Sequence, residues 1–459
     1  MTPDAELQIF AIKRGMIEKR MDVSFFQLMQ KDISIFNMVT LGELCCEEPN
    51  YGSSQSAVKK EHYQQPNYIR ITDFSDVGIE KNHEFVSVEK YSSKDVLKDK
   101  DLLFARTGAS VGKTYIHNEK IGFSVFAGYC IRFRLNQEKV LPEYVWAYTK
   151  TKRFSSWVQQ TQRKSGQPNI NKEEYKSILI PLPSIRVQQE MVTKFIIALE
   201  NRSKKLQQAE ELLAGMDEFV LETLGIKKQD ISSKIIFGVK YADVYKSRID
   251  AIFNNPHFVT RIAALKELPH DNLENIIEFS DEVWNGKDFF EDVFPYIEIS
   301  NIGLKNNIWH SNATSMDKIP SRAKMVVRNG DIIVSTTRPH RGAIAMLTFE
   351  KEQVKIASTG FSVLRNLKRS DILKEYLYWV LLNDYVLQQM LQRSSGGNYP
   401  AINQDELKKI IIPIPSIDKQ KKIIAEAERR KKLSAHLKNE AEKEWQDARE
   451  QFEKELLGE

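Results

Sequence analysis

The sequence contains little cysteine and no long apolar segment. Its three cysteines, Cys45, Cys46 and Cys130, are too few for a disulfide framework and form no zinc-binding motif. No stretch of about 18 apolar residues occurs, so we expect no membrane span. Residues 1–6 lack the basic-then-apolar pattern of a secretory signal. The eight histidines show no metal-ligand spacing. These absences predict a cytoplasmic protein without a membrane partner or a metal site.

The composition is that of a folded chain with a small excess of positive charge. Apolar residues make up 41% and charged residues 28% of the 459 residues, a balance that excludes wholesale disorder. At about 100–200 residues per domain, the length predicts two to four domains. Lys and Arg number 67 against 62 Asp and Glu, a net charge of +5. That charge is compatible with nucleic-acid binding but does not by itself indicate it.

The chain contains an internal repeat. The pattern Arg20-x-Asp22-x-x-Phe25 recurs as Arg248-x-Asp250-x-x-Phe253, and 68–72 recurs as 296–300, both 228 residues later. Gly128 matches Gly360, and from there the two copies align without a gap at a spacing of 232 residues. The aligned segments are 141–144 with 373–376, 168–171 with 400–403, and 180–185 with 412–417. A constant spacing over about 50 residues indicates a duplication. A net insertion of about four residues lies in the first half of the second copy.

Each copy has the same order of predicted elements. Strand-like segments come first, at 68–72, 101–105, 129–134, 331–335 and 361–364. A helical pattern follows at about 141–163 and 373–393. A Pro-x-Pro segment comes next, and it is predicted to be extended because proline disfavours helix at the preceding residue. A long polar helix ends each copy. We therefore predict an α+β fold with two mixed domains and two long helices.

The long helices carry narrow apolar seams. The seam residues are Val187, Met191, Phe195, Leu199, Leu206, Leu213, Met216 and Val220 in the first helix, and Ile424, Ala427, Leu433, Leu437, Ala441, Trp445, Ala448, Phe452 and Leu456 in the second. Each helix has about 35–40 residues and a length on the order of 50–60 Å. Because a lone helix with so thin a stripe is marginal, we expect an antiparallel, coiled-coil-like pair with one mixed domain at each end.

These patterns predict five segments. They are an N-terminal arm at 1–19, a first domain at 20–185, a central helix at 186–230, a second domain at 231–417 and a C-terminal helix at 418–459. The Arg20/Asp22 and Arg248/Asp250 pairs are expected to form structural ion pairs or hydrogen bonds.

The duplicated motifs resemble the specificity subunit of type I restriction-modification enzymes, over nearly the whole chain. The resemblance rests on the repeated Arg-x-Asp-x-x-Phe, the Tyr-Ile-x-Ile-[Thr/Ser] strand, the loop at 166–171 with a looser counterpart at 397–403, and the Ile-Pro-[Leu/Ile]-Pro-Ser-Ile lead-in to each long helix. Each motif is weak alone, but duplicated and in this order they are specific.

The resemblance implies a non-catalytic subunit that binds double-stranded DNA. Each target-recognition domain would read one half of a split site, and the helices would set the gap between the halves. Two modification subunits would bind the helices and carry S-adenosylmethionine and adenine-N6 methyl transfer. A restriction subunit, where one is present, would add translocation and cleavage that use ATP and Mg²⁺. The chain itself would hold no cofactor. Two DNA-binding domains held at a fixed separation also require a bipartite DNA site.

Two segments imitate catalytic motifs. Gly108–Thr114 resembles a phosphate-binding P-loop, but it has three residues between its glycines where that loop needs four, and Thr337–Gly342 replaces it in the second copy. Asn255–Phe258 resembles the Asn-Pro-Pro-aromatic motif of adenine methyltransferases, but His257 replaces the second proline and no glycine-rich loop precedes it. We interpret the first as a basic turn after a strand and the second as a turn between helix and domain.

The candidate DNA contacts lie in three loops of each copy. The strand-end turn (106–113 and 336–342) offers Arg106, Thr107, Ser110, Lys113, Thr336, Thr337, Arg338, His340 and Arg341. The post-helix loop (163–170 and 393–402) offers Arg163, Lys164, Gln167, Asn169, Arg393, Ser394, Asn398 and Tyr399. A third loop offers Ser53, Ser54, Lys59 and Lys287. Arginine can bind guanine O6 and N7 with two hydrogen bonds, and glycines let the backbone approach DNA.

Each of these loops also has an ordinary structural interpretation. The post-helix loop could be a solvated turn that caps the preceding helix with glycine, and the third loop could be a plain surface loop. Asn171 and Asn403 are expected to cap the next short helix, since Asn is a favoured N-cap residue.

Helix faces not used in mutual packing are candidate docking sites for the modification subunits. Their residues are Arg202, Lys205, Gln208, Glu211, Lys438 and Glu442, whereas Trp445 is expected to be a seam residue. Two other functions remain open at this point. One is a structural adaptor that spaces two protein-binding modules without contacting DNA. The other is an NTPase, which would lose ATP binding in a Lys113→Ala variant.

Overall fold

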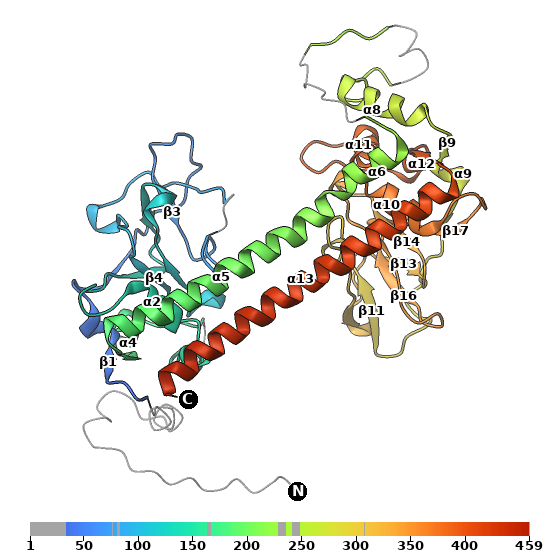
Figure 1. Cartoon of the computed structure of the whole chain (residues 1–459). Coiled ribbons are helices and arrows are strands. Elements are labelled where there is room, and N and C mark those ends of the chain that lie inside the picture. Colours follow the sequence, from blue (N-terminus) through green and yellow to red (C-terminus); the bar gives the residue numbers. More distant parts are fainter. Residues whose placement is uncertain are drawn as a thin grey trace, which may run out of the picture. The chain divides into compact units, whose positions relative to one another are not determined.

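The structure, a computed structural model, describes residues 34–75, 77–79, 83–162, 167–227, 236–240, 248–306 and 308–458. The chain forms two compact units (Figure 1). Unit 1 comprises Met1–Lys205 with Asn439–Glu459, and unit 2 comprises Leu206–Lys438. Each unit therefore combines one mixed domain with segments of both long helices. The predicted arm at 1–19 and the Arg20/Asp22 pair lie outside the described residues, and the limits of the five predicted segments stay predictions.

Unit 1 contains a four-stranded antiparallel sheet in the order β2-β7-β4-β5. The strands are β2 (Asn50–Tyr51), β7 (Cys130–Phe133), β4 (Leu102–Ala105) and β5 (Thr114–Ile116). Two smaller pairs flank it, β1 (Met38–Thr40) with β8 (Leu179–Pro181), antiparallel, and β3 (Asn67–Ile69) with β6 (Ser124–Phe126), parallel. Strand β4 is buried along its whole length, with Leu102 and Phe104 in one core and Leu103 and Ala105 in another. Burial on both faces explains its continuous apolar run.

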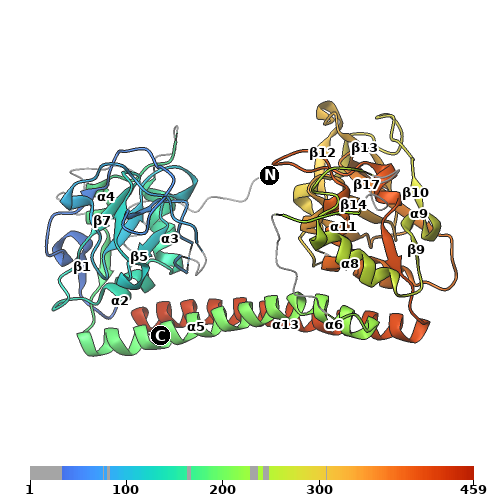
Figure 2. The ribbon, with the colours of Figure 1, turned by 90° about the horizontal axis from the view of Figure 1, so that it is seen from above.

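The helices of unit 1 refine the sequence prediction. The helical pattern predicted at 141–163 is present, but it is divided into two helices, α2 (Pro142–Tyr148) and α3 (Lys152–Thr161). The chain turns at Thr151, whose side chain accepts a hydrogen bond from the N–H of Phe154 at 3.2 Å and so caps α3. Figure 2 shows both helices beside β5. The short α4 (Lys172–Lys176) begins at Asn171, which confirms the predicted cap.

Short 3-10 turns connect these elements. In unit 1 they are η2 (Leu41–Leu44), η3 (Ser93–Asp95), η4 (Gly108–Ser110) and η5 (Glu119–Ile121), and in unit 2 they are η6 (Ile299–Asn301), η7 (Met316–Lys318) and η8 (Pro339–Arg341). The turns η4 and η8 both follow the central strand of their sheet. They are therefore matching parts of the duplicated domain.

Unit 2 repeats the architecture of unit 1 and adds two strands. Its antiparallel sheet has the order β10-β17-β14-β15, with β10 (Ile277–Ser280), β17 (Phe361–Leu367), β14 (Ile332–Ser335) and β15 (Ile344–Met346). The pair β9 (His270–Asn272) and β18 (Ile411–Pro413) matches β1 and β8. The parallel pair β11 (Val293–Ile297) and β16 (Lys355–Ser358) matches β3 and β6, and β12 (Asn312–Ser315) and β13 (Ala323–Val327) extend it to four strands. Part of the predicted insertion falls among these added strands.

The helices of unit 2 follow the same plan. The predicted helix at 373–393 is again two, α10 (Lys374–Leu381) and α11 (Asp384–Arg393), separated at the cap residue Asn383. Asn403 caps α12 (Gln404–Lys408) as predicted. The short α9 is Leu273–Ile276, and α8 is Pro256–Lys266. Asn255 caps α8 by accepting a hydrogen bond from the His257 N–H at 2.9 Å. The segment interpreted as a turn is therefore the start of a helix.

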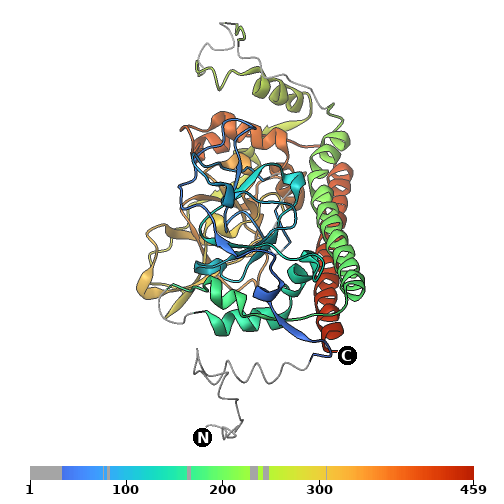
Figure 3. The ribbon, with the colours of Figure 1, turned by 90° about the vertical axis from the view of Figure 1, so that its left-hand side faces the viewer.

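The long helices are α5 (Ile185–Ala214), α6 (Met216–Leu224) and α13 (Ile417–Leu457). Within each unit, segments of the first and second long helices run side by side and antiparallel (Figures 1 and 3). In unit 1, Lys194 pairs with Glu455 at 2.8 Å and Lys205 with Glu444 at 2.7 Å. In unit 2, the hydroxyl of Ser434 donates to the carbonyl of Ala209 at 2.8 Å. The α+β fold with duplicated domains and a long antiparallel helix pair is confirmed.

The apolar seam agrees with the prediction except near the middle of α13. In unit 1, Trp445 is buried against Phe195, with ring centroids 4.8 Å apart, which confirms it as a seam residue. In unit 2, Leu433 is exposed, and the buried positions are Ser434 and Ile423. The prediction of Leu433 as a seam residue is therefore wrong. The seam slips by one position here, where a break at Gly215 separates α5 from α6 and admits the Arg430 guanidinium.

Each unit also has a carboxylate that joins the opposite long helix to its mixed domain. In unit 1, Glu453 of α13 accepts hydrogen bonds from the backbone N–H groups of Lys152 (3.2 Å) and Arg153 (2.9 Å) at the start of α3. In unit 2, Asp217 of α6 accepts from the N–H of Asp384 (2.8 Å) at the start of α11. A negative charge at a helix N-terminus is stabilising because the first N–H groups lack intrahelical partners.

A buried glutamine attaches each long helix to the domain that precedes it. Gln188 of α5 accepts from the Leu141 N–H at 2.8 Å and donates to the Pro183 carbonyl at 2.9 Å. Gln420 of α13 makes the matching bonds with Leu373 and Pro415. Both glutamines are fully buried. The repeat thus conserves a polar contact inside the core, where unpaired groups are costly.

We predict that Gln188→Ala lowers the free energy of unfolding by about 1–3 kcal/mol, because it leaves the buried Leu141 N–H without a partner. Urea denaturation of the full chain, followed by tryptophan fluorescence, measures the change. The control is Gln208→Ala on an exposed position of α5, with an expected change within about 0.5 kcal/mol. Equal effects of the two substitutions would contradict the role of Gln188.

Candidate nucleic-acid interface

In unit 1, the strand-end turn is paired with the post-helix loop through the backbone. Thr107 and Asn169 form an antiparallel bridge. The N–H of Gly108 donates to the Pro168 carbonyl at 3.0 Å, and the N–H of Ile170 donates to the Arg106 carbonyl at 2.9 Å. Gly108 has a φ of 69°, which a residue with a side chain adopts only at a cost.

Unit 2 contains the same pairing. Thr337 bridges Ala401, the N–H of Arg338 donates to the Pro400 carbonyl at 2.7 Å, and the N–H of Ile402 donates to the Thr336 carbonyl at 2.9 Å. Two loops that were predicted separately from the sequence therefore form one surface in each unit. They form a polar, glycine-containing edge at the end of the buried central strand.

An arginine of each strand-end turn stacks on a tyrosine. The Arg106 guanidinium lies 4.8 Å from the ring centroid of Tyr51, and that of Arg338 lies 3.9 Å from the ring centroid of Tyr399. Arg338 also donates from Nη2 to the Asn398 carbonyl at 3.0 Å. Such stacking holds the planar guanidinium group in one orientation, so the arginine loses less conformational entropy when it binds a ligand.

The backbone of Arg338 is strained. Its φ of 49° and ψ of 50° place it in the left-handed region, which costs a non-glycine residue about 1–2 kcal/mol. The Pro400 hydrogen bond and the Tyr399 stack hold it there. Strain of this kind is typical of functional sites.

The shape of the turn in unit 1 depends on Tyr175 of α4. Its hydroxyl donates to the Ala105 carbonyl at 2.8 Å and accepts from the Gly112 N–H at 3.2 Å. Gly112 has a φ of 86°, and a Cβ there would lie 2.8 Å from Val158 of α3. The turn is thus fixed against α3 and α4. Because β5 follows it, and not a helix, it lacks the structure of a P-loop.

His340 lies partly buried in the turn of unit 2. Burial lowers the pKa of its imidazole, and the nearby charges of Arg341 and Arg338 lower it further. Its Nδ1 is buried and has no hydrogen-bond partner among the described residues. The environment of His340 therefore favours the neutral imidazole, which keeps an unpaired polar atom beside two arginines.

Four predicted DNA contacts have roles within the fold, and two others lie outside the described residues. Ser53, Thr107 and Ser394 are buried, and the Ser394 hydroxyl donates to the Met390 carbonyl at the end of α11. Arg393, which is partly buried, pairs with Glu406 at 2.8 Å, so its charge is neutralised within the unit. DNA contact by these four residues stays a prediction that these contacts do not support. Arg163 and Lys164 fall outside the described residues.

The remaining predicted contacts lie at least partly on the surface and stay predictions. They are Ser54, Lys59, Arg106, Ser110, Lys113, Gln167, Asn169, Lys287, Thr336, Thr337, Arg338, His340, Arg341, Asn398 and Tyr399. Tyr51, which opens the third predicted loop, supports Arg106. One tyrosine was missed: Tyr129, 60% exposed, accepts a hydrogen bond from the Arg106 N–H through its carbonyl at 3.0 Å. Its only sequence signal is an aromatic residue beside a glycine.

Three of the helix residues predicted to face partner subunits form ion pairs within unit 1. Arg202 pairs with Glu442, and Lys205 pairs with Glu440 and Glu444. These three predicted residues therefore contribute to mutual packing of the helices. Gln208, Glu211 and Lys438 remain accessible. Whether any of the six contacts a partner stays a prediction.

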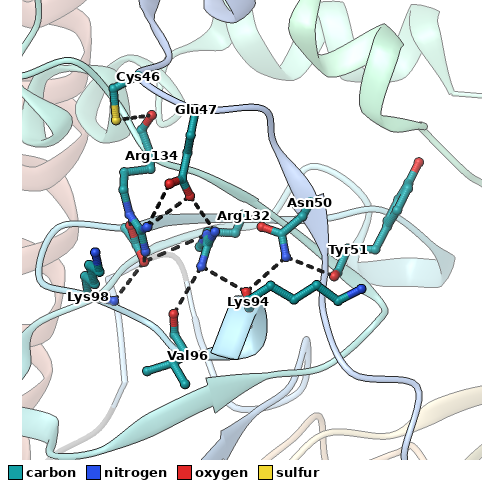
Figure 4. A network of polar contacts seen from close by, with 10 residues as sticks. Cys46, Glu47, Asn50, Tyr51, Lys94, Val96, Lys98, Arg132 and Arg134 are labelled. Carbon is teal, nitrogen blue, oxygen red and sulfur yellow. Dashed lines mark hydrogen bonds and ion pairs between the residues drawn. The ribbon is translucent and has the colours of Figure 1, made fainter. Parts of the chain in front are cut away.

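A second group of arginines in unit 1 differs from those of the turn (Figure 4). Arg134 pairs with the buried Asp101 at 2.7 Å and with Glu47 at 2.9 Å, and Arg132 also contacts Glu47. Burial lowers the pKa of Arg132. Unit 2 has a matching group of Arg365, Asp331, Glu282 and Arg328. Because carboxylates neutralise these arginines at the start of the central strand, we assign them to the fold. The Arg248/Asp250 ion pair, at 2.9 Å, is likewise structural as predicted.

In the described parts of the chain, no group of three or more His, Cys, Asp or Glu side chains is arranged to hold a metal ion. No described helix is both long and apolar enough to cross a membrane.

The chain is similar to known DNA specificity proteins. A sequence model of the type I restriction modification DNA specificity domain matches residues 34–213 and 269–443. The type I restriction enzyme MjaVIII specificity subunit of Methanocaldococcus jannaschii is 21% identical over 352 residues, 75% of each chain. The type I restriction enzyme HindI specificity subunit of Haemophilus influenzae is 26% identical over 137 residues, 29% of each chain.

Solved structures are similar over most of their length. The HsdS subunit from Thermoanaerobacter tengcongensis is 16% identical, with 92% of this chain and 97% of that chain covered and a TM-score of 0.37. The type I restriction-modification S subunit from M. genitalium is 13% identical, with 93% and 96% covered and a TM-score of 0.42.

We predict that His340 titrates below the usual histidine pKa of about 6.5. The unfolded chain then binds more protons than the folded chain, so this histidine's contribution to stability is lost as the pH falls below about 6.5. NMR titration of the imidazole, assigned with a His340→Gln variant, measures the midpoint. A midpoint at or above 6.5 would contradict the assigned environment. In Arg341→Gln, the midpoint is expected to rise.

Proposed function

This chain belongs to the type I restriction modification DNA specificity family, and from that membership we propose which of its residues contact DNA and with which subunits it assembles. It is a sequence-specific DNA-binding specificity subunit of a type I restriction-modification complex, and each of its two domains reads one half of a bipartite site. The subunit itself is non-catalytic.

The observation that carries the proposed DNA contacts is the repeated surface of turn and loop. In both units, the strand-end turn and the post-helix loop are joined by backbone hydrogen bonds, and an arginine stacked on a tyrosine lies on that surface. A guanidinium group held in this way at the edge of a loop can donate two hydrogen bonds to guanine O6 and N7 in the major groove. Exposed amides such as Asn398 and Gln167 suit adenine or phosphate.

Unsatisfied polar atoms support the same surface. Among the described residues, neither the buried Nε of Arg106 nor the buried Nδ1 of His340 has a hydrogen-bond partner. Buried polar atoms are usually paired, so an unpaired one at the surface of a loop is available to a partner outside the chain. Both atoms belong to the strand-end turns, one in each unit. We propose that Arg106, Arg338, His340 and Arg341 lead base recognition.

The proposed partners are modification subunits that bind S-adenosylmethionine and methylate adenine at N6. A restriction subunit, where one is present, would use ATP and Mg²⁺ to translocate and cleave DNA. Both chemistries belong to the partners. An adaptor without DNA contact is not favoured, because the matching family model describes a DNA specificity domain in both copies.

We predict that Arg338→Ala relaxes recognition of only one half-site, because the repeat places the reading of the other half in unit 1. Loss of a bidentate contact is expected to cost about 1–3 kcal/mol against the correct base, or roughly 5- to 150-fold in relative affinity. Competition binding of the complex to a set of duplexes with single base changes measures the effect. Arg106→Ala is the matched control and should relax the other half-site.

Each outcome of this experiment is informative. Changes confined to opposite halves in the two variants support separate reading by the two domains. A uniform loss of affinity across all sequences would contradict base recognition by these arginines and assign them to phosphate contact. Changes in the same half for both variants would contradict the division of labour between the units.

A further inference from the structure

Unit 1 contains a basic groove beside its strand-end turn. The groove has a volume of about 440 Å³ and lies between the turn, α3 and the last part of α13. Its charged lining residues are Lys113, Lys150, Lys152 and Arg449, and its polar ones include Ser155, Gln159 and Gln162. None of the described residues that line it is a carboxylate. The groove therefore concentrates four positive charges in a wall that also offers hydroxyl and amide groups.

The cations are held by different contacts. Lys150 donates to the carbonyl and hydroxyl of Thr114 at 3.2 Å each and lies 5.0 Å from the ring centroid of Trp146. Lys152 pairs with Glu450 at 2.9 Å on the exposed rim. The Nε of Arg449 is buried in the wall, and no described residue is its hydrogen-bond partner. The N–H at this atom is therefore available to donate to an acceptor from outside the chain.

The corresponding place in unit 2 is closed. At the spacing of 232 residues, Lys150 corresponds to Leu382 and Lys152 corresponds to Asp384. Leu382 and Asp217 line a cavity of only about 20 Å³ there. Lys305 fills it by pairing with Asp217 at 3.0 Å.

The same fold thus forms without the basic groove. Unit 2 keeps the two-helix element, the cap at its second helix and the buried central strand, yet it has Leu382 and Asp384 where unit 1 has Lys150 and Lys152. Stability of the fold therefore does not explain these two lysines of unit 1. A wall that carries cations and no lining carboxylate attracts an anionic ligand.

We propose that this groove binds a backbone phosphate of double-stranded DNA, next to the bases read by unit 1. The proposal rests on the proposed function, because the groove is continuous with the strand-end turn through Gly112 and Lys113. A phosphodiester oxygen is the acceptor that lysine, arginine and amide groups bind together at DNA interfaces. The contact is independent of sequence and has no counterpart in unit 2, so the two domains bind DNA with unequal electrostatic strength.

The test uses the full chain in complex with its modification subunits and a duplex that contains the recognised site. The variants are Arg449→Gln and Lys150→Leu, the second being the residue that unit 2 carries. Arg186→Gln is the control, since it removes one exposed charge of α5 outside the groove. Thermal unfolding verifies that each variant folds. Affinity is measured over a range of salt concentrations, for the specific duplex and for a random duplex.

Loss of one phosphate contact is expected to lower the slope of log K against log salt by about 0.9. Arg449→Gln and Lys150→Leu should each weaken both duplexes by the same factor, so that the specificity ratio is unchanged. A series of duplexes, each with one neutral methylphosphonate, should locate the contacted phosphate. Neutralising that phosphate should lower the DNA affinity of the wild type and leave the affinity of Arg449→Gln unchanged. The control should leave the slope unchanged.

Three results would overturn the inference. One is an unchanged salt slope and affinity in folded groove variants. The second is a change in the specificity ratio alone, which would assign the groove to bases. The third is loss of binding to the modification subunit with DNA contact unaffected, which would assign the groove to an acidic protein segment. Failure of the wild-type complex to bind DNA in a salt-dependent way would instead contradict the proposed function.

Discussion

Two backbone hydrogen bonds hold the turn after the central strand against the loop that follows the paired helices, and the candidate DNA surface depends on them. In unit 1 they join Gly108 to Pro168 and Ile170 to Arg106. About sixty residues of chain separate the two segments, and the intervening chain forms β5, β7, α2 and α3. The pairing of the two segments gives Arg106 a fixed backbone, and its guanidinium stacks on Tyr51. The repeated pairing in unit 2 indicates that the fold preserves this contact while the side chains on it vary.

The long helices belong to this same support. Within unit 1, Gln188 of α5 binds the start of α2, and Glu453 of α13 caps the start of α3. The far end of α3 leads into the post-helix loop. A displacement of either helix segment would therefore shift the loop that carries the candidate contacts. Unit 2 has the same contacts through Gln420 and Asp217. Each domain is thus held by segments of both long helices, which is how a scaffold can position a reading surface.

Local features were predictable from the sequence, and contacts between distant residues were not. The strands at 102–105 and 332–335 and the caps Asn171 and Asn403 follow from short-range patterns of burial and capping. The split of the predicted helices at Thr151 and Asn383 was missed because the apolar spacing continues through both helices. Leu433 was misassigned because apolar spacing favoured it, whereas Ser434 is buried and donates a hydrogen bond to the Ala209 carbonyl across the helix pair. Arg393 was predicted to contact DNA because basic charge in a loop signals DNA, whereas Glu406, which neutralises it, is recruited only by folding.

We propose that this chain directs a complex to one split DNA site. Mapping of N6-methyladenine across the genome of the source organism, with and without the gene, measures this specificity. We expect one motif to lose methylation, and this motif to consist of two defined halves separated by a constant number of unspecified bases. Loss of methylation at an uninterrupted motif, or no change at any motif while the modification subunit is expressed, would contradict the proposed role of the chain.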